Sequence, residues 1–187
     1  MDDKNLLNCN EKPVWFALSA PFNKEFEAQK LLEKHSIENF LPLQYKLVQL
    51  CTGKKVKKLV PAVSNLIFAR TTKAVLQDIK CGVKYLQYKT RKQSGKNIPI
   101  IVPDEQMKLF MAVCGTLNEK LIYLSPDEIN IAKGTKVKII GGTFDGVEGI
   151  FMKVSGTRNK RVVVMIEGLT AVATAEISGD LLQVMRL

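Results

Sequence analysis

The chain has 187 residues and a formal net charge of +10, from 28 Lys and Arg against 18 Asp and Glu. Hydrophobic residues make up 46% and charged residues 25% of it, which is typical of a soluble globular protein and excludes a disordered or collagen-like chain. No apolar run approaches the roughly 18 residues of a membrane span, and the N-terminus lacks a signal-type apolar stretch, so we expect a cytoplasmic protein without membrane contact.

The first residues predict a buried strand followed by a helix. Val14–Leu18 is an uninterrupted run of β-branched, aromatic and aliphatic residues, the pattern of a strand covered on both faces. Asn23 is a favourable N-cap. Apolar residues then recur at helical spacing from Ala28, and the pattern ends at His35. We expect this histidine to end the helix and to carry no chemistry.

An extended run from Ile37 to Leu50, interrupted by Pro42, leads into a turn at Thr52-Gly53. A second extended arm follows and reaches Pro61. Two arms around a glycine turn predict a β-hairpin. Its tip is expected to carry four lysines: Lys54, Lys55, Lys57 and Lys58.

The next segment alternates between strands and helices. We predict a strand over Asn65–Thr71 and a short helix over Lys73–Ile79. Strands over Val83–Lys89 and Ile98–Val102 are expected to be joined by a polar basic loop, Thr90–Asn97. This first part of the chain therefore predicts an α+β sandwich.

A further helix is predicted to begin at Pro103-Asp104-Glu105, because proline suits the first turn and acids suit the positive end of the helix dipole. Gly115 is placed to end it. Its buried stripe is expected to contain Met107, Phe110, Met111 and Cys114.

Residues 116–132 are expected to form a connection, in which Ser125–Glu128 is a candidate capping box. After this connection the sequence no longer shows helical periodicity. Short strands with glycine turns between them follow, which predicts a small β-barrel. The four strands are expected at 134–140, 147–154, 161–166 and 169–174, with a closing strand at 181–185.

Positive charge is concentrated in one segment. Gln44–Lys96 holds 13 basic residues and one acid, Asp78, so its charge is +12 and the rest of the chain has −2. Such one-sided charge produces a positive field suited to a polyanion. The alternative is a solvated basic face without a partner, which the concentration of the charge disfavours.

Cysteine and histidine usage excludes the common metal sites. The cysteines are 42, 30 and 33 residues apart, and His35 is the single histidine. Zinc sites need clustered thiolate and imidazole ligands. We expect no metal, no cofactor and reduced, mostly buried thiols at the four positions Cys9, Cys51, Cys81 and Cys114.

Within the predicted barrel, the stretch Val137–Ile150 resembles the KOW motif, V-x-I-x-x-G-x-F-x-G-x-x-G-x-V. Glycines in this motif permit a tight turn and close backbone approach. The matching residues are Gly142, Phe144, Gly146 and Gly149.

The N-terminal half resembles the NGN domain of the NusG family in Trp15–Leu18, in Ile37–Pro42 and in Pro61–Arg70, which is similar to that family's P-L-F-P-G-Y-V-F-V-R stretch. Where the family has Phe-Pro-Gly-Tyr, this chain has Val63-Ser64-Asn65-Leu66, which is closer to the specialised UpxY-like antiterminators. The resemblance implies four regions: a flexible N-terminus (1–13), an NGN α/β sandwich with a mixed or antiparallel sheet (14–115), a linker (116–131) and a KOW (SH3-like) barrel (132–187).

The resemblance further implies a monomeric, non-enzymatic factor that suppresses pausing and termination, with polysaccharide biosynthesis operons as its candidate targets. An apolar patch with Val63 and Leu66 would bind the clamp region of RNA polymerase; simple core packing is the alternative for both. The four lysines would face upstream or non-template DNA. The KOW domain would recruit a ribosomal protein or termination factor, with Phe144 and Leu169 as candidates for that face.

Two other functions compete with this one. A ribosome- or RNA-associated KOW protein would share the basic charge and the barrel. An enzyme is disfavoured, because the chain has one histidine and lacks GxSxG, GxxxxGK[ST] and HxxE-type motifs. The paired acids Asp104-Glu105 and Asp127-Glu128 lie at predicted helix starts, where capping explains them.

Overall fold

Helices and mostly antiparallel strands make up the computed structural model, which describes residues 12–51, 53–125, 128, 134–154, 156–174 and 181–185. The expected flexible N-terminus lies almost wholly outside the described residues. The chain divides into two compact units: unit 1 is 1–41 with 64–104, and unit 2 is 42–63 with 105–187. The described part contains no helix of the length and apolar character that crossing a membrane requires.

Unit 1 is built on β1 (Val14–Ser19), which pairs antiparallel with β5 (Ile67–Thr71), β6 (Gln87–Tyr88) and β9 (Ile101–Val102). Strand β2 (Glu38–Phe40) pairs with the other edge of β5. The residues of β1 from position 15 to 18 are all at most 3% exposed. This confirms the prediction of a strand covered on both faces.

Helix α1 (Glu25–Lys34) packs against β2 and β5, and His35 caps its end as predicted. The predicted N-cap is wrong: Lys24 occupies that position, and its carbonyl accepts the first helical bond from Ala28 at 2.8 Å. Asn23 lies one residue earlier with φ 58°. Asparagine tolerates this left-handed conformation better than most residues, so it shapes the turn rather than the cap.

Helix α2 (Lys73–Gly82) is longer than predicted, and Thr72 caps it by accepting a hydrogen bond from the Val75 amide at 3.4 Å. Leu76 and Ile79 form its buried side, whereas Val75 is 45% exposed.

The predicted basic loop after β6 is a hairpin of its own. Strands β7 (Thr90–Gln93) and β8 (Lys96–Pro99) pair antiparallel. The turn between them is Ser94-Gly95, with φ angles of 48° and 76°. Two consecutive positive φ angles define the turn type whose twist matches a two-residue hairpin.

Helix α3 (Asp104–Cys114) begins and ends where predicted. Its buried residues are Met107, Phe110, Val113 and Cys114, whereas Met111 is half-buried. A Cβ on Gly115 would lie 2.8 Å from the Met111 carbonyl oxygen, so a larger residue at this end of the helix would require the backbone to shift.

The main sheet of unit 2 has six strands in the order β10-β14-β13-β12-β11-β15, all neighbours being antiparallel. The strands are β10 (Ile122–Leu124), β11 (Thr135–Ile139), β12 (Glu148–Lys153), β13 (Lys160–Ile166), β14 (Thr170–Ala173) and β15 (Leu182–Val184). The four predicted strands are confirmed, and the expected closing strand pairs with β11.

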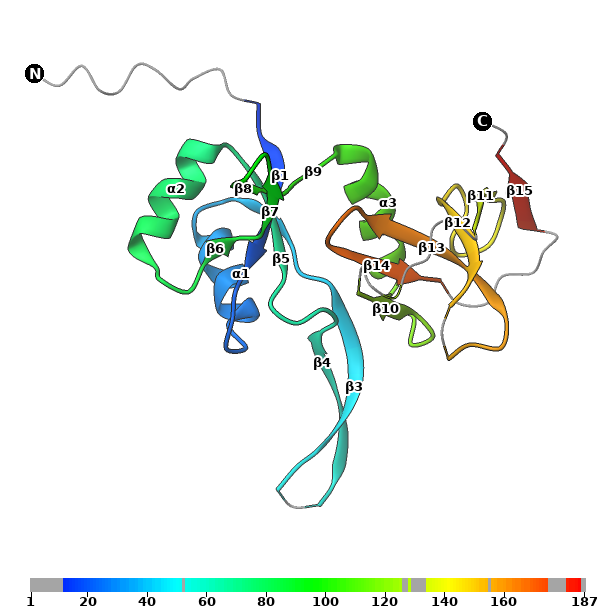
Figure 1. Ribbon diagram of the computed structural model, residues 1–187. Helices are drawn as coiled ribbons and strands as arrows, with labels where there is room; N and C mark the ends of the chain where they lie inside the picture. The colour runs from blue at the N-terminus through cyan, green and yellow to red at the C-terminus, as the bar shows by residue number, and fades with distance from the viewer. Residues whose placement is uncertain are drawn as a thin grey trace, which may run out of the picture. The chain divides into compact units, whose positions relative to one another are not determined.

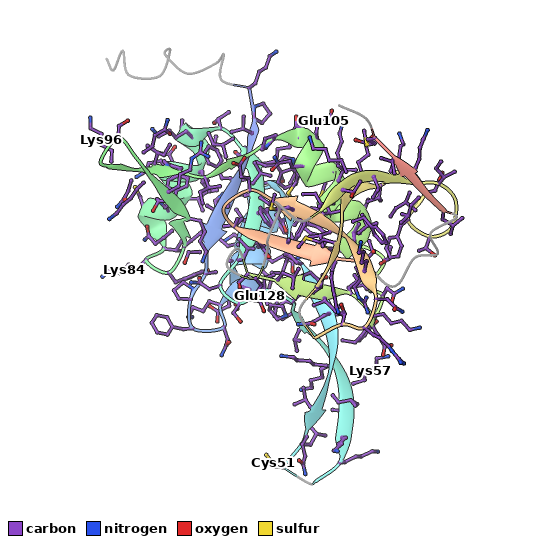
Figure 2. All side chains as sticks on the ribbon, turned by 45° about the vertical axis from the view of Figure 1, so that its right-hand side comes forward. Cys51, Lys57, Lys84, Lys96, Glu105 and Glu128 are labelled. Atoms are coloured by element: carbon purple, nitrogen blue, oxygen red, sulfur yellow. The ribbon has the colours of Figure 1, made fainter. Side chains whose placement is uncertain are left out.

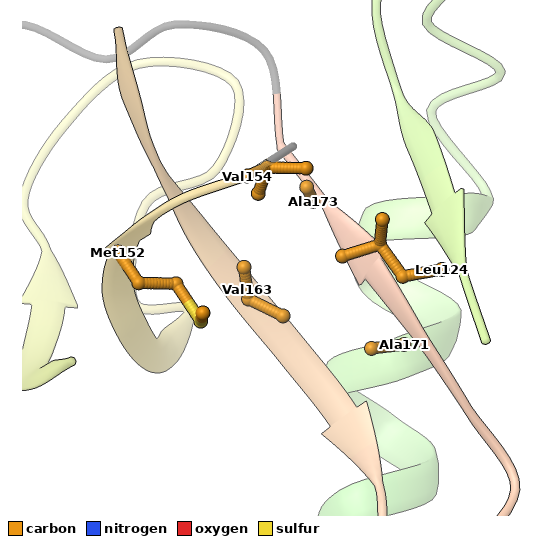
Figure 3. Packing of buried hydrophobic residues seen from close by; sticks show 6 residues of the cluster. All are labelled: Leu124, Met152, Val154, Val163, Ala171 and Ala173. Carbon is orange, nitrogen blue, oxygen red and sulfur yellow. The ribbon is translucent and has the colours of Figure 1, made fainter. Parts of the chain in front are cut away.

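Part of the expected connection belongs to this sheet. Leu124 of β10 is buried in a cluster with five other residues, which come from β12, β13, β14 and the position just after β12 (Figure 3). Those five are Met152, Val154, Val163, Ala171 and Ala173. The burial of β10 against β14 explains why the segment after α3 is a strand rather than a free linker.

Candidate nucleic-acid interface

Strands β3 (Leu43–Gln49) and β4 (Lys55–Pro61) form a two-stranded antiparallel ribbon of seven residue pairs (Figure 1). The ribbon closes where the Leu50 amide donates to the Lys54 carbonyl at 2.9 Å. Gly53 has φ 79° and its amide donates to the Leu50 carbonyl at 2.8 Å. Glycine suits this left-handed turn position, as the sequence predicted.

One face of the ribbon places two lysines opposite each other. Lys46 of β3 pairs with Lys58 of β4, and Val48 pairs with Val56 beside them. Side chains directly opposite in an antiparallel pair are about 5 Å apart at Cβ, and like charges there are destabilising. Residues 42–63 contain five lysines and no acid, so the segment itself supplies no neutralising charge.

The opposite face mixes basic and apolar side chains. Tyr45 is 42% and Leu47 72% exposed, and they lie opposite Leu59 and Lys57. The Lys57 ammonium lies 4.8 Å from the centre of the Tyr45 ring and pairs with the Glu119 carboxylate. Lys57 is thus the tethered lysine of the ribbon.

The base of the ribbon is held by hydrogen bonds within unit 2. The Ala62 amide donates to the Pro42 carbonyl at 2.8 Å, and the Tyr123 hydroxyl donates to the Leu43 carbonyl at 3.4 Å. Burial raises the pKa of Tyr123, so its hydroxyl keeps its proton and remains a donor. These bonds fix where the lysine-bearing strands leave the unit.

The predicted lysines therefore lie along a strand rather than only at the tip. Lys54 is at the turn, whereas Lys55, Lys57 and Lys58 belong to β4; Figure 2 shows Lys57 well away from Cys51 in the turn. Among the described residues, no acidic group pairs with Lys54, Lys55 or Lys58. All three are exposed and available to a polyanion.

Sequence reasoning missed Lys46 as a site residue. A signal was present, because Lys46 and Lys58 are each six positions from Thr52 in the predicted turn. Counting outward from the turn would have paired them. Glu119, which tethers Lys57, is 62 residues away in sequence and left no such signal.

The predicted polymerase-binding role of Leu66 is wrong, because its side chain is 1% exposed. The preceding residue explains this orientation. Asn65 has φ 59°, its amide donates to the Glu25 carboxylate at 2.7 Å, and the Ser19 hydroxyl donates to its side-chain oxygen at 2.6 Å. These bonds fix the turn that sends Leu66 into the core. Val63 is half-buried.

Unit 1 has an apolar hollow elsewhere. It has a volume of about 390 Å³, and Ile101 at its edge is 53% exposed. The other residues that line it are Lys12, Val14, Phe16, Lys73, Ile98 and Pro99. An exposed aliphatic side chain beside such a hollow suits an apolar partner surface.

The KOW residues have structural roles in the turn before β12 and, for Gly149, within β12 itself. Gly142 and Gly146 have φ angles of 74° and 78°, and Phe144 is 7% exposed. A Cβ on Gly149 would lie 2.6 Å from the Val163 carbonyl oxygen of β13. The burial of Phe144 contradicts its expected place on a partner-binding face, whereas Leu169 is half-buried.

The described cysteines do not gather. Cys51 and Cys81 are exposed, against the expectation of burial, and Cys114 is buried. Cys9 lies outside the described residues. In the described ranges, no group of three or more His, Cys, Asp or Glu side chains is arranged to hold a metal ion.

Comparison with known proteins identifies the family. Residues 13–111 match the family model of NusG, "Transcription termination factor nusG", which is 99 of 187 residues. The chain is also similar to a solved structure described as "Domain interaction in Thermotoga maritima NusG", with 16% identity, a TM-score of 0.46, and coverage of 94% of this chain and 98% of that one. No curated protein has a significantly similar sequence. Because the family match covers more than half of the chain, the chain belongs to the NusG family, whose members are non-enzymatic factors of transcription elongation and antitermination.

Proposed function

We propose that this protein binds RNA polymerase in the cytoplasm and suppresses pausing and termination, while the β3–β4 ribbon contacts upstream or non-template DNA. The observation that carries the proposal is the ribbon itself, which bears five lysines and no acid within a chain of the NusG family. The direct opposition of Lys46 and Lys58 supports it further. Phosphates between these two cations would relieve their repulsion.

The proposed action on the polymerase is a shift between its conformations. A bound factor promotes elongation only if it binds the active state more tightly than the paused state. The ribbon adds phosphate contacts, which position the factor without reading sequence. Each lysine that engages duplex DNA contributes about −0.9 to the slope of log K against log salt. Replacing Lys54, Lys55, Lys57 and Lys58 by glutamine should therefore flatten this slope without altering the fold, and an unchanged slope would refute the role of the ribbon.

For the polymerase contact we propose the hollow beside Ile101 in place of the buried Leu66. The exposed aliphatic side chain and the apolar lining support this surface. Ile101→Ser should weaken binding to purified polymerase several-fold. Val75→Ser is the matched control, because Val75 is similarly exposed at 45% and does not line the hollow. Equal affinities of the two variants would rule this surface out.

The proposal extends to a second partner for the sheet of unit 2, a ribosomal protein or a termination factor. The half-buried Leu169 remains a candidate contact, whereas the buried Phe144 does not. A role at polysaccharide operons, in the manner of UpxY-like antiterminators, is part of the same proposal and is supported by the departure at Val63–Leu66.

The KOW motif also favours a second candidate, a protein that binds ribosomal RNA. Co-purification separates the two functions. Tagged protein purified from cells should retain RNA polymerase subunits after nuclease treatment. Retention of ribosomal RNA without polymerase would instead support the second candidate and contradict the first.

A further inference from the structure

Unit 1 carries a basic ribbon of its own, the β7–β8 hairpin. From Ile79 to Pro103 the chain has six basic residues and no acid. Three of them, Arg91, Lys92 and Lys96, are on the hairpin and exposed; Figure 2 shows Lys96 at its end. Among the described residues, none of the three pairs with an acidic group. This leaves a cationic hairpin without an acidic partner in the part of the chain that the structure describes.

The register places cations on both faces of this ribbon. Arg91 lies opposite Ile98 and Lys96 opposite Gln93, so both cations point to one face because they are on alternate pairs. Lys92, opposite Asn97, lies on the other face. A ribbon charged on both faces can be neutralised fully only by anions on both sides.

The ribbon stands on a rigid base. The Lys89 amide donates to the Ala17 carbonyl at 2.9 Å, and the Ala17 amide donates to the Ile100 carbonyl at 3.1 Å. The Ile100 amide in turn donates to the Lys89 carbonyl at 2.8 Å. Both arms are thereby joined to β1, whose Ala17 is fully buried. Anchored in this way, the cations are held in place rather than carried on a free loop.

We propose that the β7–β8 hairpin inserts into a groove of duplex nucleic acid, with Arg91 and Lys96 toward one phosphate strand and Lys92 toward the other. The major groove of B-DNA is about 12 Å wide and admits a two-stranded ribbon. Its two walls present phosphates to both faces, whereas an acidic protein surface would meet only one. The inference concerns unit 1 alone and does not depend on the β3–β4 ribbon or on polymerase binding.

The test measures binding of the full chain to a duplex of about 20 base pairs in mixed sequence, between about 50 and 200 mM salt. The triple variant Arg91→Gln, Lys92→Gln, Lys96→Gln should flatten the slope of log K against log salt by about 2.7, which is 0.9 for each contact. Lys92→Gln alone should flatten it by about 0.9, which checks the second face. The control removes three exposed lysines from other surfaces: Lys34→Gln, Lys108→Gln and Lys153→Gln.

A slope in the triple variant equal to that of the control would overturn the proposal. An equal loss on single-stranded DNA would overturn the groove geometry, because a single strand has no second wall. A larger loss on poly-glutamate than on the duplex would indicate an acidic protein partner and would also refute it. Thermal unfolding that matches the wild type shows that the fold is intact. Since polymerase is absent from the assay, its outcome is separate from that of the elongation function.

Discussion

Because Lys46 and Lys58 lie opposite each other in the β3–β4 ribbon, one substitution should increase the stability of the ribbon and decrease its affinity for nucleic acid. Lys46→Glu replaces a like-charge pair with Lys58 by an opposite-charge pair. The ribbon should become more stable, because an opposite-charge cross-strand pair contributes about 0.2–1 kcal/mol. Binding to DNA should become weaker, because the proposed DNA-binding ribbon loses a cation.

The expected changes in ribbon stability and in DNA binding can both be estimated from the Lys46–Lys58 pair. A gain of about 0.2–1 kcal/mol corresponds to roughly 1.4- to 5-fold slower hydrogen exchange for the amides of β3 and β4. Loss of one phosphate contact removes about 0.9 from the salt slope, so a fourfold rise in salt should weaken the variant roughly 3.5-fold less than the wild type.

The matched control is Lys55→Glu, which makes the same charge change opposite the neutral Gln49. It should flatten the salt slope by a similar amount and leave hydrogen exchange nearly unchanged, since no lysine lies across from it. Amide exchange measured by NMR and fluorescence titration of a DNA duplex provide the two readouts. Faster exchange in Lys46→Glu, or a salt slope equal to that of the wild type, would refute the reasoning.

Three further variants test the scaffold. Gly149→Ala should lower the free energy of unfolding by about 1–3 kcal/mol, because its Cβ would lie 2.6 Å from a β13 carbonyl oxygen; Gly82→Ala, with open space around its Cβ, is the control, and equal melting temperatures would contradict the packing argument. Glu25→Ala should cost about 1.5–3 kcal/mol through the lost bond from the Asn65 amide, and that amide should exchange faster; unchanged exchange would show that the bond is not needed. Burial raises the pKa of Cys114 from 9.0 to about 12, so its contribution to stability is complete below pH 9 and is lost between pH 9 and 12. Over that range the unfolding free energy of the wild type should fall more steeply than that of Cys114→Ala, by about 1.4 kcal/mol per pH unit, and parallel curves from denaturant titrations would refute this.

The sequence patterns predicted the elements well where local chemistry decides them. The apolar run of β1, the dipole-matched start of α3 and the glycine turn at Gly53 each appear where expected. The short strands of unit 2 were predicted equally well, because each is bounded by turn residues. The N-cap prediction at Asn23 was wrong because asparagine suits both an N-cap and a left-handed turn, and Asn23 adopts the left-handed conformation.

The predictions that were wrong concern features that depend on contacts between residues far apart in the sequence. Whether Leu66 faces solvent is decided by the bonds that Glu25 and Ser19 make to Asn65, at separations of 40 and 46 residues. The burial of Leu124 likewise depends on its packing in the cluster around β14. The periodicity of apolar residues within a segment does not indicate either of these long-range contacts. The basic segment 90–97 has the composition of a polar loop, and only the cross-strand pairing of β7 with β8 shows that it is a hairpin.

Transcription by purified polymerase on a template with a defined pause and a terminator is the most direct test of the proposed activity. Added protein should shorten the pause and raise read-through, and the variant with Lys54, Lys55, Lys57 and Lys58 changed to glutamine should do so less, most visibly at higher salt. Pause lifetimes and read-through that stay the same with and without the wild-type protein would contradict the account.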